Sequence, residues 1–388
     1  MFFLNPFLFP VYFNDNYCLP AIDFETFKKS GAIARAIGAD PRLGAMFDIE
    51  DPAIGRFLDQ ASTLIENYVD AEYRSAIISG KPPQLAGSNG LGWDPALYHS
   101  VLHSTAGILR AIEFVAHGGI VASSLSSGMH HASPSRGAGF CTVNSLALGG
   151  LFAADLGLNV VILDFDAHCG GGTEAFLRAY SDDAPVTHID LSLVGYDTYE
   201  PRSQGTWSRL SSPDTYLNDV DEALRHAIAG EPDIVIYNAG VDIWPAIDKE
   251  VVRERDERVA RTLAWAGAGC VVVMAGGYGA ESDVVSLHLS TLKAFAESKD
   301  AFVTADSMER RRGTNEPIRW TSRYDSSRHA LRSRKLFMRL MAMQPRPAPT
   351  RCFICHRPQG SRPIAGMSLD RNRYCSWCQQ IYDNPTGD

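Results

Sequence analysis

The sequence predicts an α/β fold in which a mostly parallel central sheet is covered by helices on both faces. Short apolar runs alternate along the chain with longer stretches of helical periodicity, which is typical of strand–helix–strand units. Strands with such apolar runs are usually buried on both faces. At 388 residues and 45% hydrophobic, the chain can form one large domain of this kind plus a small appendage.

Each predicted strand ends in a polar or glycine-rich segment, and a predicted helix precedes or follows it. Ligands in such folds collect at the carboxyl ends of the strands, so these segments are the candidate functional residues. In chain order, the strands are expected at residues 119–122, 160–163, 234–237 and 271–274, and the helices at 100–117, 142–156, 215–228, 256–268 and 284–296.

Three of the strand-end residues suit a catalytic metal. Asp166 and His168 follow the second predicted strand, and Asp242 follows the third. Alone, a strand-end aspartate more often caps a helix, and a lone histidine is more often a core residue. One imidazole and two carboxylates at the same edge of a sheet instead favour a divalent cation with an open coordination position. Such a ligand set does not separate zinc from iron.

The other strand ends carry residues for metal-assisted hydrolysis of an amide. Adjacent His130 and His131 follow the first strand and can supply a general base and a second polar group. Tyr278, after two glycines, can donate its hydroxyl to the oxyanion that forms when a carbonyl is attacked. A metal would polarise that carbonyl and activate water.

Five ordered motifs then resemble the zinc-dependent histone deacetylase family, whose fold is arginase-like. The resemblance covers roughly residues 10 to 300 and is strongest to class IV and bacterial members. The motifs are residues 127–132, 137–144, 164–168, 240–242 and 276–278.

This resemblance implies a role for each motif residue. Asp166, His168 and Asp242 would bind one catalytic Zn²⁺. His131 would be the base, His130 its electrostatic partner, and Tyr278 the group that polarises the acyl carbonyl. These six residues would make the chain a zinc-dependent deacetylase.

The resemblance also implies a substrate channel. Gly139 and Phe140 would line it, and Asp94 would hold the substrate at the rim. The second aromatic wall has two candidates, Tyr196 and Tyr199. The substrate would be an acylated amine, namely a protein lysine, a polyamine or a small metabolite, and the sequence leaves these alternatives and the acyl-chain length open.

A monovalent cation, K⁺, is the remaining ligand that the resemblance implies. Asp164 and the backbone near Asp190 and Leu191 resemble the K⁺ site of the family. Asp164 would also orient His130.

One position departs from the family. Gly171 stands where members usually have Asp or Asn, so the expected hydrogen-bond partner of the second histidine is missing. Either activity is low or the partner comes from elsewhere in the chain. The departure also keeps open a second hypothesis, a catalytically degenerate protein that binds an acyl ligand or nucleic acid without turnover.

Binuclear manganese ureohydrolases share this fold and resemble the chain at 166–168. They need two further bridging carboxylates, but Gly170 and Trp244 occupy those positions. The sequence therefore favours a mononuclear site.

The C-terminal part is predicted to be separate from the catalytic domain at residues 1–308. A basic, helical arm is expected at 309–350 and a zinc-binding module at 351–388. Two CxxC pairs separated by 19 residues predict a second, structural Zn²⁺. Its ligands would be Cys352, Cys355, Cys375 and Cys378.

Charge divides the chain in the same way. Residues 301–388 hold 16 Lys and Arg against 7 Asp and Glu, so the remaining 300 residues hold 20 against 38. The basic tail could bind nucleic acid or dock on the acidic catalytic domain or a second subunit of a homo-oligomer. Neither a signal peptide nor a membrane span is recognisable, so we expect a cytoplasmic protein that does not bind membranes.

Overall fold

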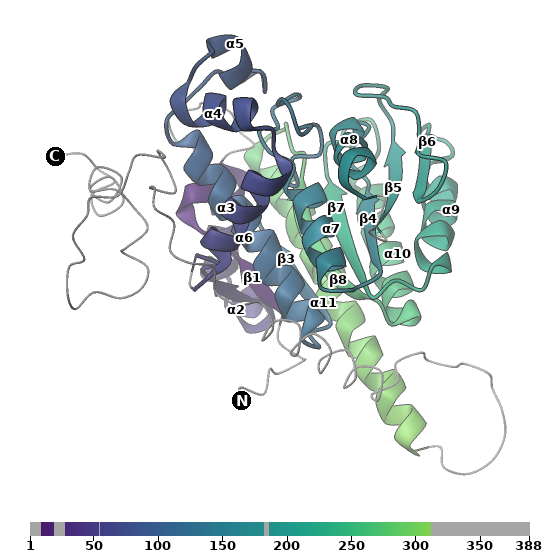
Figure 1. Cartoon of the computed structure of the whole chain (residues 1–388). Helices are drawn as coiled ribbons and strands as arrows, with labels where there is room; N and C mark the ends of the chain where they lie inside the picture. Colours follow the sequence, from purple (N-terminus) through teal and green to yellow (C-terminus); the bar gives the residue numbers. More distant parts are fainter. Residues whose placement is uncertain (1–8, 19–27, 54, 182–185, 312–388) are drawn as a thin grey trace.

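A single parallel sheet forms the centre of the molecule. The structure is a computed structural model that describes residues 9–18, 28–53, 55–181 and 186–311, with side chains up to residue 298. Its strands follow the order β2-β1-β3-β8-β7-β4-β5-β6 and every pairing is parallel, which confirms the predicted sheet (Figure 1). The strands are β1 (Pro10–Tyr12), β2 (Asp48–Glu50), β3 (Val121–Ser124), β4 (Val160–Asp164), β5 (Val186–Ser192), β6 (Thr206–Leu210), β7 (Ile234–Gly240) and β8 (Gly269–Ala275).

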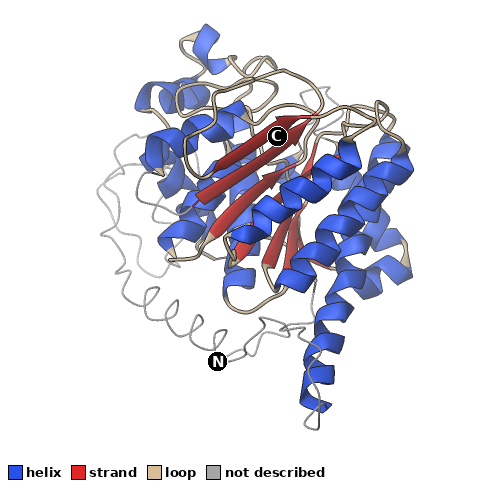
Figure 2. Ribbon diagram, turned by 90° about the vertical axis from the view of Figure 1, so that its right-hand side faces the viewer, coloured by secondary structure: helices blue, strands red, loops and turns tan. Residues whose placement is uncertain are grey.

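Helices cover both faces of the sheet, as Figure 2 shows. The described helices are η1 (Asp15–Tyr17), α1 (Lys29–Ala39), α2 (Pro41–Met46), α3 (Phe57–Tyr68), α4 (Ala71–Ser79), α5 (Pro83–Ala86), α6 (Leu97–Ala116), α7 (Ser145–Asp155), α8 (Gly171–Tyr180), α9 (Tyr216–Ala229), α10 (Lys249–Ala266) and α11 (Glu281–Arg311).

The apolar runs of the strands supply two hydrophobic cores, one on each face. In β4, Val160 and Ile162 pack with residues of α3, α6 and α7, whereas Val161 and Leu163 pack with residues of α9, α10 and α11. Because successive side chains of a strand point to opposite faces, a strand between two helical layers must be apolar throughout. This explains why the central strands carry no polar alternation.

The five helices predicted between residues 100 and 296 all exist, and one is much longer than expected. The stretch predicted at 284–296 is part of α11, which continues to Arg311. Between Glu281 and Arg311 there is no glycine or proline to end the helix. Helix α11 therefore crosses the proposed domain boundary at residue 308. That boundary stays a prediction, and the basic arm and the zinc module lie outside the described residues.

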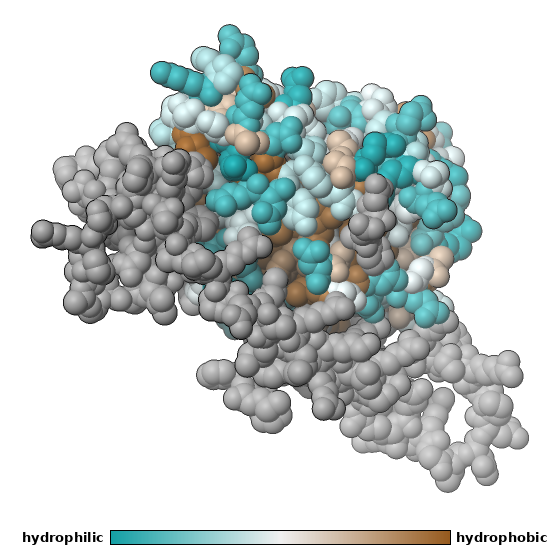
Figure 3. All heavy atoms as spheres, in the orientation of Figure 1, coloured by the Kyte–Doolittle hydropathy of each residue, from teal (hydrophilic) through white to brown (hydrophobic). Residues whose placement is uncertain are grey.

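In Figure 3 the described part of the visible face is mostly hydrophilic, with smaller hydrophobic areas between. None of the described helices combines the length and hydropathy needed to cross a bilayer. The four scattered cysteines carry free thiols; Cys141, Cys169 and Cys270 are buried and Cys18 is half-buried.

Candidate active site

The three expected metal ligands lie together at the carboxyl edge of the sheet. Asp166 and His168 follow β4 and Asp242 follows β7, its neighbour in the sheet. One ligand atom from each lies within 4.8 Å of the others. His168 Nδ1 lies 3.2 Å from both Asp166 Oδ1 and Asp242 Oδ2. Apart from this ion pair with His168, the buried Oδ2 of Asp242 has no hydrogen-bond partner among the described residues. A buried carboxylate oxygen with so few partners fits a divalent cation.

The pKa values of the three expected ligands also fit a bound cation at this position. Hydrogen bonds to Asp166 and Asp242 raise the pKa of His168 to about 9. Burial and the nearby Asp166 raise the pKa of Asp242 to about 6. Burial opposes ionisation of Asp166, but His130 and His168 outweigh it and hold the pKa of that carboxyl below its usual range. Two buried carboxylates thus need a positive charge between them. A divalent metal ion carries a larger positive charge than a bound proton does.

A buried arginine joins the two loops that carry these ligands. Arg255 of α10 donates from Nη1 to Phe165 O at 3.1 Å and to Gly240 O at 2.6 Å. Its Nε donates to Asp256 at 2.8 Å, and neither side chain is exposed. The carbonyls belong to the ends of β4 and β7, so one guanidinium fixes the spacing of both strand ends.

The two adjacent histidines differ in their surroundings. His130 Nδ1 lies 2.8 Å from Asp164 Oδ2, and its Nε2 lies 3.5 Å from Asp166 Oδ1. Burial alone would lower the pKa of His130, but the two carboxylates outweigh it and hold the pKa well above its ordinary value. Burial and the charge on His130 lower the pKa of His131. One histidine is therefore kept protonated and the other neutral, the pattern of an acid and base pair.

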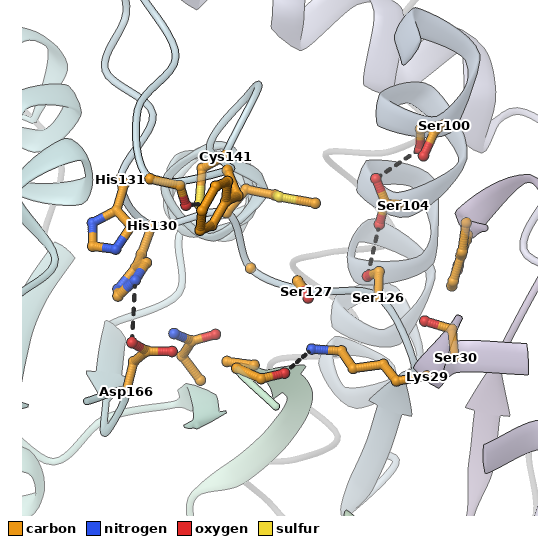
Figure 4. A pocket seen from close by; sticks show the side chains of 18 of the residues that line it. Lys29, Ser30, Ser100, Ser104, Ser126, Ser127, His130, His131, Cys141 and Asp166 are labelled. Carbon is orange, nitrogen blue, oxygen red and sulfur yellow. Dashed lines mark hydrogen bonds and ion pairs between the residues drawn. The ribbon is translucent and has the colours of Figure 1, made fainter. Parts of the chain in front are cut away.

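The loop that carries the histidines is fixed by its backbone. Asn144 caps α7, and its Nδ2 donates to His130 O at 3.1 Å and to Ala132 O at 3.2 Å. The backbone N–H of Thr173 in α8 also donates to His130 O. Figure 4 shows His130 and His131 side by side above Asp166, with Lys29 reaching toward the site from the opposite side.

Backbone strain is concentrated at this site. Four non-glycine residues of the described part have positive φ. Three of them lie at the site. Met129 immediately precedes His130, Phe140 lines the pocket, and Asp197 contacts His131. Strained backbone that clusters in this way is typical of functional sites.

Tyr278 follows β8 and lies on the other side of the pocket. Desolvation and the carboxylates of Asp166 and Asp242 raise its pKa, so its hydroxyl stays protonated and can donate. The loop before it approaches the metal ligands closely, since a Cβ on Gly276 would lie 2.5 Å from Asp242 Cγ. Buried Lys29 donates from Nζ to Gly276 O at 2.5 Å and so fixes this loop. Burial lowers the pKa of Lys29 to about 8.

Aromatic side chains surround the entrance of the pocket. The exposed ring of Phe140 lies 6.3 Å from the ring of Tyr278. The exposed ring of Tyr196 packs edge-on against His131, with 5.0 Å between centroids. A Cβ on Gly139 would lie 2.3 Å from His131 Cδ2, so only glycine allows this approach. Of the two candidates for the second wall, Tyr196 is exposed, whereas the hydroxyl of Tyr199 is directed inward to Asp190 at 2.8 Å; the wall itself stays a prediction.

Two further predicted sites have structural partners. Asp94 Oδ1 accepts from the backbone of Ala96 at 2.7 Å, at the start of α6. Asp164 also accepts from Asn238 at 2.7 Å and lies near buried Asp190, whose pKa burial raises to about 6. The substrate role of Asp94 and the K⁺ site at Asp164 stay predictions.

Comparison with known proteins identifies the family. The sequence profile of the histone deacetylase domain matches residues 64–293, which is more than half of the chain. The chain belongs to the histone deacetylase family.

Several relatives agree with this membership. An uncharacterized protein of Picosynechococcus sp. is 30% identical over 225 residues, which are 54% of this chain and 73% of that protein. Histone deacetylase 2 of Arabidopsis thaliana is 32% identical over 40% of this chain and 43% of its own length. Acetylpolyamine amidohydrolase of Burkholderia pseudomallei is 25% identical over 44% and 52%. The chain thus matches about half the length of the two relatives with a named activity.

The fold also agrees with a solved member. A crystal structure of acetylpolyamine aminohydrolase from Burkholderia pseudomallei superimposes with a TM-score of 0.56 and 19% identity. The superposition covers 76% of this chain and 99% of that one. The arginase/deacetylase fold predicted from the sequence is therefore confirmed.

Sequence reasoning missed two residues of the site. Asp197 Oδ2 lies 2.9 Å from His131 Nδ1, where Gly171 had left the partner missing. The signal in the sequence is that Asp197 lies between Tyr196 and Tyr199, the two candidates for the aromatic wall beside the histidines. Lys29 was also missed, because a lysine at a helix start is usually exposed.

Proposed function

We propose that this chain is a metal-dependent amidohydrolase that removes an acetyl or other acyl group from an acylated amine. The observation that supports this most is a pocket lined by His130, His131 and Tyr278, in which Asp166 belongs to a ligand set of two carboxylates and one histidine. Each chemical role required for amide hydrolysis has a residue of suitable chemistry.

In the proposed mechanism Asp166, His168 and Asp242 would hold one divalent ion, which the family resemblance suggests is zinc. When bound, it would supply Lewis-acid chemistry for the acyl carbonyl and for water. His131, which is neutral, takes the proton of the water. His130 is positively charged and stabilises the negative charge that develops nearby, and Tyr278 donates its hydroxyl to the oxyanion.

The proposed substrate is an amine on a narrow arm, with the arm passing between Phe140 and Tyr196 and the acyl carbonyl facing Tyr278 and the metal ligands. Acetyl-lysine peptides and acetylated polyamines are the first candidates, since two relatives are named for histones and acetylpolyamines. The alternative of a degenerate binding protein rested on Gly171. Asp197 beside His131 removes that reason, so hydrolysis is favoured.

Activity and metal content of the full chain test this proposal together. Chelation should abolish release of acetate from an acetyl-lysine peptide or an acetylated polyamine, and added Zn²⁺ should restore it. His131→Ala and Tyr278→Phe should each lower kcat by on the order of 10²-fold or more. Tyr180→Phe, at the far end of α8, is the matched control and should keep the wild-type rate. The proposal fails if neither substrate is hydrolysed by zinc-loaded protein or if both site variants keep the full rate.

A further inference from the structure

The carboxylate that orients the catalytic base comes from an unexpected part of this chain. We infer that Asp197, in the loop after β5, is the positioning residue of His131 and that Gly171 is the gap that admits it. This inference rests on the proposed function of His131. It concerns a residue that lies outside the five motifs named above.

The first argument is the hydrogen bond. Asp197 Oδ2 lies 2.9 Å from His131 Nδ1, and the two side chains are 27% and 5% exposed. A carboxylate can only accept, so Nδ1 carries the hydrogen and Nε2 keeps the lone pair that a base requires. The same arrangement recurs beside it, where Asp164 Oδ2 lies 2.8 Å from His130 Nδ1.

The second argument is steric. A Cβ on Gly171 would lie 2.4 Å from Asp197 O and 2.6 Å from Asp197 Oδ1. Any side chain at position 171 would therefore displace Asp197. The absence of a side chain at 171 therefore leaves the space that Asp197 occupies, and the carboxylate reaches the imidazole from a different loop.

The third argument is the rigidity of the loop. Val194 donates to Ala167 O at 2.8 Å, and Cys169 donates to Tyr196 O at 3.1 Å, so the loop is bonded to the segment that carries His168. Asp197 has a φ of 60°, a conformation that aspartate tolerates better than most residues. Its Oδ2 also accepts from the backbone of Gly172 at 3.1 Å, at the start of α8. These contacts hold the carboxylate in place before substrate binds.

Kinetics of two variants test the role. Asp197→Ala should lower kcat by about 10- to 100-fold, the usual cost of losing such a partner, and leave KM within about twofold. Asp197→Asn should recover part of the loss, because its amide oxygen can still accept from Nδ1. Glu200→Gln removes a charge from the same loop and should change nothing. Full kcat in Asp197→Ala would overturn the inference.

A double-mutant cycle tests the steric coupling. Gly171→Ala should lower kcat by displacing Asp197. In Asp197→Ala the added Cβ still meets the backbone oxygen of residue 197, but no carboxylate is left to displace, so the further loss of kcat should be smaller than in the wild type. Gly195→Ala is the control, since its Cβ would meet nothing closer than 3.8 Å. Independent, additive losses would contradict the coupling.

A spectroscopic measurement separates this inference from the proposed function. In chelator-treated protein, histidine ¹H–¹⁵N NMR should show His131 as the Nδ1–H tautomer with a downfield proton, assigned by its loss in His131→Ala. Asp197→Ala should remove that proton signal. If the proton signal persists in Asp197→Ala, the inference fails even if the enzyme is active. If the signal disappears but the wild-type protein cleaves no acyl-amine, only the proposed function fails.

Discussion

Replacing Asp256 with alanine should destabilise the fold and loosen the metal site. Asp256 is fully buried and accepts from Arg255 Nε at 2.8 Å, from the Tyr237 hydroxyl at 2.6 Å and from Thr291 Oγ1 at 2.6 Å. Alanine would leave a buried guanidinium without its counter-charge, which costs about 3–5 kcal/mol. Because a typical free energy of unfolding is about 5–15 kcal/mol, the variant should still fold but keep only a small free energy of unfolding.

The assay is urea unfolding followed by circular dichroism, with the metal affinity measured alongside. Affinity should fall because Arg255 also holds the carbonyls of Phe165 and Gly240, at the ends of the two strands that carry the ligands. Asp221→Ala is the control. Asp221, on α9, is an exposed partner of Arg258 of α10, so its loss should cost less than about 1 kcal/mol. Equal losses of unfolding free energy in the two variants would refute this reasoning.

Two further predictions concern the rate. Because burial and His130 lower the pKa of His131 below its ordinary value of 6.5, the base is neutral above that pKa. The value of kcat/KM should therefore fall as the pH drops through an apparent pKa below 6.5, and an acid limb centred above neutral pH would contradict this assignment. Tyr196→Ala removes one wall of the entrance and should raise KM severalfold with kcat changed less; a loss confined to kcat would mean that the ring does not contact substrate.

The central part of the fold was predictable because its signals are local. The strands β3, β4, β7 and β8 are apolar runs that end in polar segments, and the sequence locates each within a few residues. Strand β5 was missed because His188 and Asp190 are buried polar residues that interrupt its apolar pattern. Strands β1 and β2 have three residues each, too few for a periodic signal.

The candidate site divides in the same way. Asp166, His168 and Asp242 could be grouped because parallel strands deliver their ends to one edge. The contact between His131 and Asp197 joins residues 66 positions apart, and no periodicity links them. Gly171 indicated that a partner was missing, but only the three-dimensional arrangement identifies which residue fills the gap.

A side chain at position 171 and the carboxylate of Asp197 cannot occupy the same space. This limits the order in which the two substitutions could have been acquired. If an ancestor had Asp or Asn at 171, acquiring Asp197 first would have forced two side chains into the same space, since even a Cβ at 171 lies 2.4 Å from residue 197. Losing the residue at 171 first would have left an imidazole without its acceptor until the second substitution appeared. From such an ancestor, the route would have passed through an impaired intermediate or a remodelled loop, and reconstructed ancestral sequences could reveal which.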